Sequence, residues 1–320
     1  MKLWKRIILF FAMFIVVYLG VCVVLTPKTK ADKGGDKFFA GRGFEAEANN
    51  TIEVVGIGNS DLYSAFNPLE LYRLYGITSY CCGVAKASPM LGYRLLQDIT
   101  KKQQIKVCIV ETDFLYEKMG MADYTQALIK LQFLASPFIY HARWKNLKWQ
   151  DFTKLPKLDD NYDELKGFKY SNKRYNYQLK NYMGSADSEA RALPKRSLQY
   201  LEKIRKLCDR KGIQLLFVEM PSPSSWNYAK SYGVQAYADE HHIEFIDYNI
   251  YPEYLDFDFK TDFRDKGNHL NIYGSIKVAK HLGGLLEKYQ LTDHRKTQKI
   301  WEKEVKEYED LLLKNHISIT

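Results

Sequence analysis

The chain opens with an almost unbroken run of apolar residues from Ile7 to Leu25. A helix of that length, rising about 1.5 Å per residue, nearly crosses the ~30 Å hydrocarbon core of a bilayer. Lys2, Lys5 and Arg6 precede the run, and positive charge there favours a cytoplasmic N-terminus. Three lysines between positions 28 and 33 weaken that bias. We expect residues 1–27 to form a cytoplasmic tip and a transmembrane helix, with the bulk of the chain extracytoplasmic.

A cleaved signal peptide is the alternative interpretation of this segment. Signal peptides have shorter apolar stretches that end at small residues, whereas here Val23, Val24 and Leu25 run into Thr26 and Pro27. That is a poor cleavage site, and we favour a retained anchor. The polar residues 28–50, which include four glycines, are expected to form a linker to the membrane.

Short apolar segments then alternate with segments of helical periodicity over residues 51–291. The predicted strands are 51–57, 78–82, 105–110, 213–218 and 243–246. Helices are predicted from Pro68, over 88–104, 198–210 and 234–240, and over 272–289 with Asn271 as N-cap. Continuously apolar strands alternating with helices predict an α/β fold, a flavodoxin-like parallel sheet with helices on both faces. Functional groups then gather beyond the carboxyl ends of the strands.

Two segments depart from this alternation. Residues 114–193 are rich in Tyr, Trp, Phe and Lys, and they predict a largely helical, basic insertion over one edge of the sheet. Residues 292–320 predict a highly charged terminal helix that carries Trp301, Val305, Leu311 and Leu312. We expect it to pack on the domain by this one apolar stripe, and docking to a partner is the alternative.

Composition and charge limit the function classes. The 320 residues are 46% hydrophobic and 27% charged, which is typical of a globular protein. A net charge of +9 favours anionic partners without choosing between polymers, lipid headgroups and nucleic acid. A domain outside the cytoplasm rarely meets nucleic acid, so we expect a wall polymer, a glycan or the membrane surface. The absence of CxxC pairs and of Gly-rich nucleotide loops predicts no metal and no organic cofactor.

Candidate chemistry lies at the two ends of the alternating region. Ser60 follows the first predicted strand, where a hydroxyl and nearby backbone N–H groups can meet an acyl carbonyl. By position alone, this serine would only cap the next helix. His269 lies between the last predicted strand and the last helix of the region, so it should reach the same edge of the sheet. Asp265 is close enough to orient the imidazole, which leaves the other ring nitrogen free to take the serine proton.

These two segments resemble a known superfamily. Gly-Asn-Ser-Asp at 58–61 and the Asp…His-Leu-Asn…Gly segment ending at Gly274 resemble the first and last blocks of the SGNH (GDSL-like) hydrolases. The resemblance covers residue 51 to about residue 286 and leaves out the insertion. The membrane anchor and the His-Leu-Asn-x-x-Gly ending are most similar to DltD-like and alginate-acetylation-type proteins. Those proteins work beside membrane-bound O-acyltransferases that modify surface polymers.

The resemblance assigns a role to each matching residue. It implies Ser60 as nucleophile, His269 as general base and Asp265 as the carboxylate that orients it. The N–H groups of Ser60 and Gly83 would form the oxyanion hole. The common spacing in the superfamily is Asp-x-x-His, and Asp265 is one residue further from His269. Asp262 therefore stays open as an alternative orienting carboxylate.

A second departure concerns the oxyanion hole. Glu111-Thr112-Asp113 stands where the superfamily has Gly-x-Asn-Asp, so the usual asparagine donor is unaccounted for. Loss of one such donor typically costs ~2.7–4 kcal/mol of transition-state stabilisation. The resemblance implies an extracytoplasmic serine esterase or O-acyltransferase, acting on acetyl esters of a cell-surface polysaccharide or wall polymer. The alternative is a non-catalytic SGNH-like scaffold or a polymer-binding accessory protein.

Overall fold

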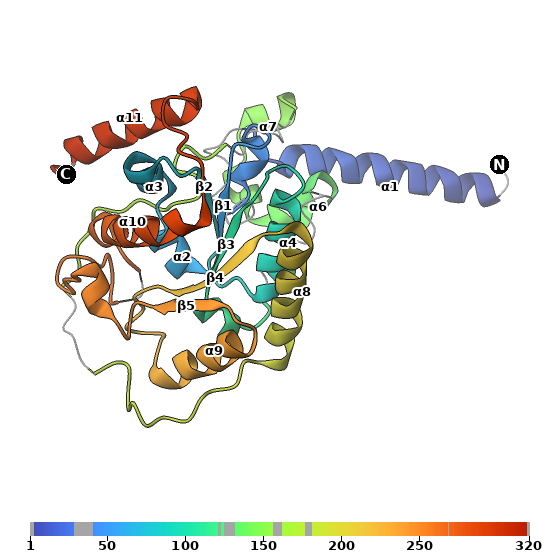
Figure 1. Cartoon of the computed structure of the whole chain (residues 1–320). Helices are drawn as coiled ribbons and strands as arrows, with labels where there is room; N and C mark the ends of the chain where they lie inside the picture. The colour runs from blue at the N-terminus through green and yellow to red at the C-terminus, as the bar shows by residue number, and fades with distance from the viewer. Residues whose placement is uncertain are drawn as a thin grey trace. The chain divides into compact units, whose positions relative to one another are not determined.

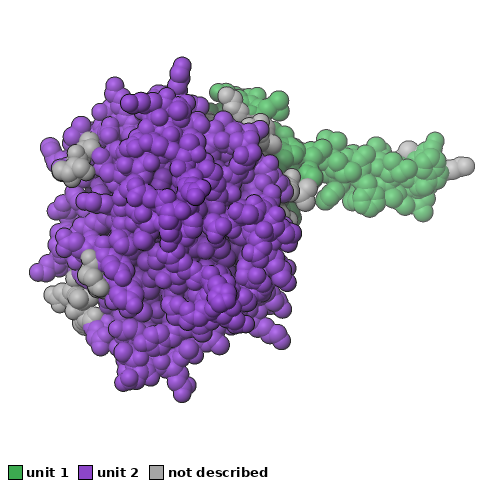
Figure 2. Space-filling view, viewed as in Figure 1, with its two compact units in different colours: residues 1–39, 121–161 green, residues 40–120, 162–320 purple. Residues whose placement is uncertain are grey.

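The computed structural model describes residues 3–28, 41–120, 123–124, 132–155, 162–176, 181–267 and 269–318. The chain divides into two compact units, one made of residues 1–39 and 121–161, the other of residues 40–120 and 162–320 (Figure 2). Most of the predicted linker, residues 28–50, lies outside the described residues. Each unit is described by itself.

The larger unit is built on a five-stranded parallel sheet with the order β2-β1-β3-β4-β5. The strands are β1 (Val54–Gly58), β2 (Ser79–Gly83), β3 (Val107–Glu111), β4 (Gln214–Glu219) and β5 (Glu244–Asp247). All five predicted strands are confirmed, with ends that differ by at most three residues. This order is that of flavodoxin-like sheets, in which sites form at the carboxyl ends of the strands.

Helices cover both faces of the sheet (Figure 1). One face carries α4 (Pro89–Ile99) and α8 (Lys195–Lys211), and the other carries α3 (Pro68–Tyr75) and α10 (Ile272–Leu286). Alternate strand residues enter the two cores, because Cys108 and Val110 pack with the first pair of helices while Val107 and Ile109 pack with the second. Burial on both sides explains why the strands are continuously apolar.

The remaining elements of this unit are shorter, apart from α9 and the C-terminal helix. They are η2 (Gly43–Ala46), α2 (Ser60–Ala65), η3 (Asp113–Tyr116), α9 (Tyr228–Glu240), η6 (Pro252–Leu255), η7 (Glu287–Tyr289) and α11 (Lys299–Lys314). The Asn271 side chain accepts hydrogen bonds from the N–H groups of Tyr273 and Gly274, which confirms it as the N-cap of α10. Trp301, Val305 and Leu312 of the predicted stripe are buried, Leu311 is half-buried, and Tyr308, which the prediction left out, is buried beside them.

The C-terminal helix is also held by a buried ion cluster. Lys166 is fully buried, and its Nζ lies 2.7 Å from both Glu47 and Glu304 and 4.9 Å from the Trp301 ring centre. Burial raises the pKa of the Glu47 carboxyl, and the Lys166 ammonium opposes that rise. A buried cation that lost these carboxylates would be strongly unfavourable, so α11 is an integral part of the unit.

The insertion differs from the prediction in its second half. The described residues 162–176 and 181–193 contain no helix, so the prediction of a largely helical insertion is wrong for them. Their backbone groups are bonded to the α/β unit instead. Lys166 O accepts from Cys81 N, and Lys169 N donates to Tyr63 O. Because these groups find partners outside the segment, it needs no helical hydrogen bonds and forms turns and irregular structure.

The smaller unit contains the long N-terminal helix. α1 (Leu3–Leu25) is long and apolar enough to cross a membrane. Residues 132–155 of the insertion belong to the same unit and are largely helical, as predicted, with α6 (Gln132–Ile139), η5 (His141–Asn146) and α7 (Trp149–Thr153). All three of these elements contact α1.

Candidate active site

Ser60 lies at the carboxyl edge of the sheet, as the first residue of α2 directly after β1. The Asn59 side chain caps this helix by accepting from Asp61 N at 2.7 Å. Two acidic residues at the end of β3 hold the turn, since Glu111 Oε2 accepts from Asn59 N at 3.2 Å and Asp113 Oδ2 accepts from Asn59 Nδ2 at 3.4 Å. The Ser60 side chain is partly exposed.

His269 is hydrogen-bonded to Asp265, the orienting carboxylate that the sequence favoured over Asp262. Its Nδ1 lies 2.5 Å from Asp265 Oδ2, and its backbone N–H donates to Asp265 Oδ1 at 3.1 Å. These two contacts fold the loop back on itself. Asp265 can therefore orient the imidazole although it lies four positions before His269. Asp262, the alternative, is buried and binds Lys277 Nζ at 2.9 Å. It accepts from Asp258 N as well, and it does not orient the imidazole.

The other ring nitrogen of His269 faces a carboxylate that the sequence did not single out. His269 Nε2 lies 3.9 Å from Asp61 Oδ1, while Asp61 Oδ2 accepts from Ser222 Oγ at 2.9 Å. Burial raises the pKa of the Asp61 carboxyl to about 7, and the negative charge of Asp113 adds to the rise. The imidazole therefore lies between two carboxylates, the partly exposed one of Asp265 and the buried one of Asp61.

Ser60 and His269 are close to the same aromatic ring without being bonded to one another. Within the described residues, no hydrogen bond joins Ser60 Oγ to His269 Nε2, and Ser60 lies one helical turn before Tyr63 in α2. The Tyr63 ring lies parallel to the imidazole, with 6.3 Å between ring centres, and the Arg264 guanidinium lies 5.8 Å from the centre of the Tyr63 ring. Neither side chain is packed into the core, since His269 is 21% exposed. Nucleophile–base bonds often tighten only when substrate binds.

Gly83 ends β2 beside the first turn of α2. A Cβ at this position would lie 2.9 Å from both Asn59 O and Tyr63 N, so only glycine lets β2 end this close to Ser60. The structure thus places Gly83 at the predicted edge. The role of its N–H as an oxyanion donor stays a prediction.

The carboxyl edge of the sheet also holds more buried acidic side chains than the sequence suggested. Burial raises the pKa of Glu111 and of Glu219 well above the usual range, and neighbouring carboxylates reinforce both rises. Thr112 Oγ1 donates to Glu219 Oε2 at 2.6 Å, and Lys230 Nζ pairs with Asp113 at 2.7 Å. The sequence could have indicated that these acidic residues lie at the sheet edge, because each of them ends or closely follows a buried strand. The Glu-Thr-Asp block therefore builds and supports the Ser60 turn.

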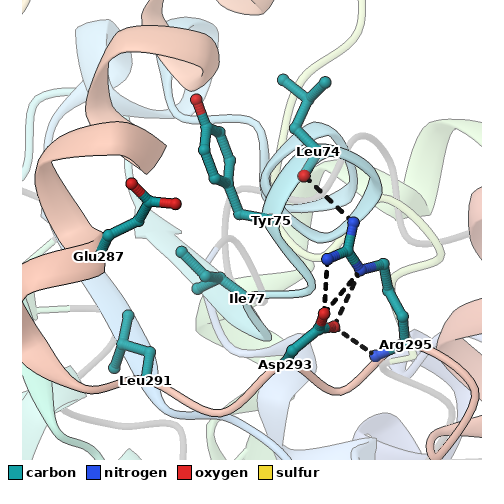
Figure 3. A pocket seen from close by; sticks show the side chains of 7 residues that line it. All are labelled: Leu74, Tyr75, Ile77, Glu287, Leu291, Asp293 and Arg295. Atoms are coloured by element: carbon teal, nitrogen blue, oxygen red, sulfur yellow. Dashed lines mark hydrogen bonds and ion pairs between the residues drawn. The ribbon is translucent and has the colours of Figure 1, made fainter.

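Two further features of the described residues bear on where chemistry could take place. In the part of the chain that the structure describes, no three His, Cys, Asp or Glu side chains are grouped to hold a metal ion. A pocket of about 350 Å³ lies elsewhere (Figure 3), lined by Leu74, Tyr75, Ile77, Glu287, Leu291, Asp293 and Arg295. Its α3 residues precede β2, which puts the pocket at the amino end of that strand. The Asp293–Arg295 ion pair forms part of its lining.

Comparisons with known proteins give similar folds at low identity. No family model matches the chain, and no curated protein matches its sequence. A candidate acylhydrolase from Bacteroides fragilis NCTC 9343 is similar with a TM-score of 0.40 and 11% identity, over 82% of this chain and 99% of that one. A GDSL-like lipase from Bacteroides thetaiotaomicron VPI-5482 has a TM-score of 0.39 and 10% identity, over 77% and 94%. A lipase/acylhydrolase from Enterococcus faecalis has a TM-score of 0.39 and 10% identity, over 76% and 98%. Similarity at this level identifies no reaction or substrate for this chain.

Proposed function

We propose that this chain is a membrane-anchored serine esterase or O-acyltransferase in which Ser60, His269 and Asp265 carry the reaction. The Asp265–His269 hydrogen bond, located at the sheet edge that holds Ser60, is the observation that carries this proposal. It fixes one ring nitrogen and leaves Nε2 to serve as a base. The partial exposure of both Ser60 and His269 leaves them open to an acyl group from solvent.

The proposed reaction has two steps. Ser60 Oγ attacks the acyl carbonyl while His269 Nε2 takes its proton, and the acyl group is transferred to the serine as the leaving alcohol takes that proton. Water or a sugar hydroxyl then attacks the acyl-enzyme with His269 again as base. The N–H groups of Ser60 and Gly83 would bind the oxyanion. Attack requires Nε2 to exchange Asp61 for Ser60 as its partner.

The setting of the reaction rests on the N-terminal helix and the family resemblance. We place α1 in the membrane and the larger unit outside the cytoplasm, where cell-surface polysaccharides and wall polymers are found. The net charge of +9 favours such anionic polymers. Acetyl is the acyl group and a membrane-bound O-acyltransferase the partner that the resemblance implies.

A second candidate function is a non-catalytic scaffold or polymer-binding accessory protein. It is favoured by the absence of a Ser60–His269 hydrogen bond in the described residues and by the carboxylate of Asp61 opposite Nε2. The replacement of the usual asparagine block by Glu111-Thr112-Asp113 points in the same direction.

The test uses the full-length chain in detergent. Wild type, Ser60→Ala and the exposed-loop control Ser185→Ala are compared for labelling by a fluorophosphonate and for hydrolysis of p-nitrophenyl acetate. Loss of both signals in Ser60→Ala alone would establish the nucleophile. Labelling without turnover would identify an acyl carrier that needs its partner. If folded wild type gives neither signal, the enzyme proposal is wrong and the scaffold takes its place.

A further inference from the structure

The smaller unit exposes several large apolar side chains and buries a few polar ones. Phe138 is 70% exposed, and Trp149 and Leu155 are each 81% exposed. Leu134, Trp144 and Phe152 are exposed as well. A contiguous apolar surface on a soluble protein usually marks a site of interaction with a protein or a membrane.

The pattern along the short helices is inverted relative to that of a water-soluble domain. Leu134 and Phe138 are four residues apart in α6, and Trp149 and Phe152 are three apart in α7, so each pair shares one exposed face. The polar side chain of Ser136 is fully buried in the same stretch. Asp151 is also buried, where its carboxylate pairs with Arg143. Polar groups satisfied inside and apolar groups outside suit a lipid environment.

Contacts within the unit fix the depth of this surface. α6 is attached to the last turns of α1, because Tyr18 Oη donates to Leu134 O at 2.6 Å and Ser136 Oγ donates to Cys22 O at 3.1 Å. Arg143 donates to Leu25 O at 2.7 Å, which satisfies a terminal carbonyl of the helix. α1 has 23 residues, close to the ~20 needed for a span, so its last turns lie at the membrane surface. The elements bonded to them lie at the same level.

We infer that α6, η5 and α7, residues 132–155, form an interfacial platform that lies in the headgroup region of the bilayer that α1 crosses. Trp144 and Trp149 suit this position, because tryptophan prefers the boundary between hydrocarbon and water. The exposed Lys145, Lys148 and Lys154 lie among the apolar side chains and match anionic headgroups. The platform rests on the part of the proposed function that makes α1 a span, and it is independent of the Ser60 chemistry.

Tryptophan fluorescence tests this directly, because the chain has five tryptophans in separable environments. Trp226 and Trp301 are buried in the larger unit, and Trp4 lies at the far end of α1. The full-length Trp4→Phe chain is reconstituted in phosphatidylcholine–phosphatidylglycerol vesicles with or without 6,7-dibromo-phosphatidylcholine. We expect the brominated lipid to quench part of the emission. The quenched part should disappear when Trp144 and Trp149 are both replaced by Phe.

The control and the contrary outcomes use the same samples. Unchanged emission from Trp226 and Trp301 in the triple variant shows that the larger unit is folded. Quenching by aqueous acrylamide but not by brominated lipid would place the surface in water and overturn the inference. Quenching by neither would mean that a protein, a second copy or a partner, covers it, which overturns it as well. If alkaline carbonate released the chain from the vesicles, α1 would not span the bilayer, and the platform would be rejected with it. Fluorophosphonate labelling of Ser60 would be unaffected by that result.

Discussion

The buried carboxyl of Asp61 gives the structure a testable dependence on pH. Burial, helped by the charge of Asp113, raises its pKa from 3.8 to about 7. Between these values the unfolded chain has released a proton that the folded chain still holds, so the free energy of unfolding falls as pH rises. The difference corresponds to a loss of up to ~4 kcal/mol between about pH 4 and pH 7.

Asp61→Asn removes this titration while keeping the shape of the side chain and an acceptor for Ser222. Relative to wild type, the variant should therefore gain up to ~4 kcal/mol on going from pH 4 to pH 8. For a domain of this size, that corresponds to a relative rise in melting temperature of roughly 8–16 °C. The assay is thermal unfolding of the full-length chain in detergent, followed by the emission of the buried Trp226 and Trp301.

Asp310→Asn makes the same chemical change at an exposed position of α11 and serves as the matched control. Its melting temperature should follow that of wild type across the pH range. If the curves for Asp61→Asn and wild type also run parallel, Asp61 does not change protonation as inferred. The reasoning from its burial would then be refuted.

Four further substitutions test other contacts. Lys166→Met leaves two glutamates buried without their cation and should cost about 3–5 kcal/mol of stability, measured by thermal unfolding. Asp265→Asn should slow fluorophosphonate labelling by roughly 10³–10⁴-fold through loss of imidazole orientation. Asp262→Asn should leave the labelling rate near that of wild type, and equal losses in both would reject the assignment. Gly83→Ala should destabilise by about 1–3 kcal/mol because its Cβ meets the backbone of α2, and an unchanged melting temperature would contradict the close approach.

The sheet could be predicted because its strands are apolar on both faces and short, a pattern that few other elements share. The cap at Asn271 could be predicted for a similar local reason. The partner of His269 was open between Asp262 and Asp265, since spacing alone does not say how the loop folds back. The structure resolves it through the second contact, from the backbone N–H of His269 to Asp265.

Contacts between distant segments could not be predicted from the sequence. Ser222 reaches Asp61 across 161 positions, and only the packing of two loops at the carboxyl edge brings them together. Residues 162–176 lie in the segment predicted as helical, yet Lys166 O and Lys169 N bond to β2 and α2 instead. Lys166 looks like any surface lysine until the positions of Glu47 and Glu304 are known.

The buried lysine has a consequence for how the chain is made. Synthesis proceeds from the N-terminus, so Lys166 leaves the ribosome long before Glu304 exists. Until the final helix arrives, the site that buries this ammonium lacks a carboxylate and the Trp301 ring, and the larger unit stays incomplete. Truncation before Lys299 would therefore expose the interior of the domain. Folding of the larger unit cannot be completed until α11 has been synthesised.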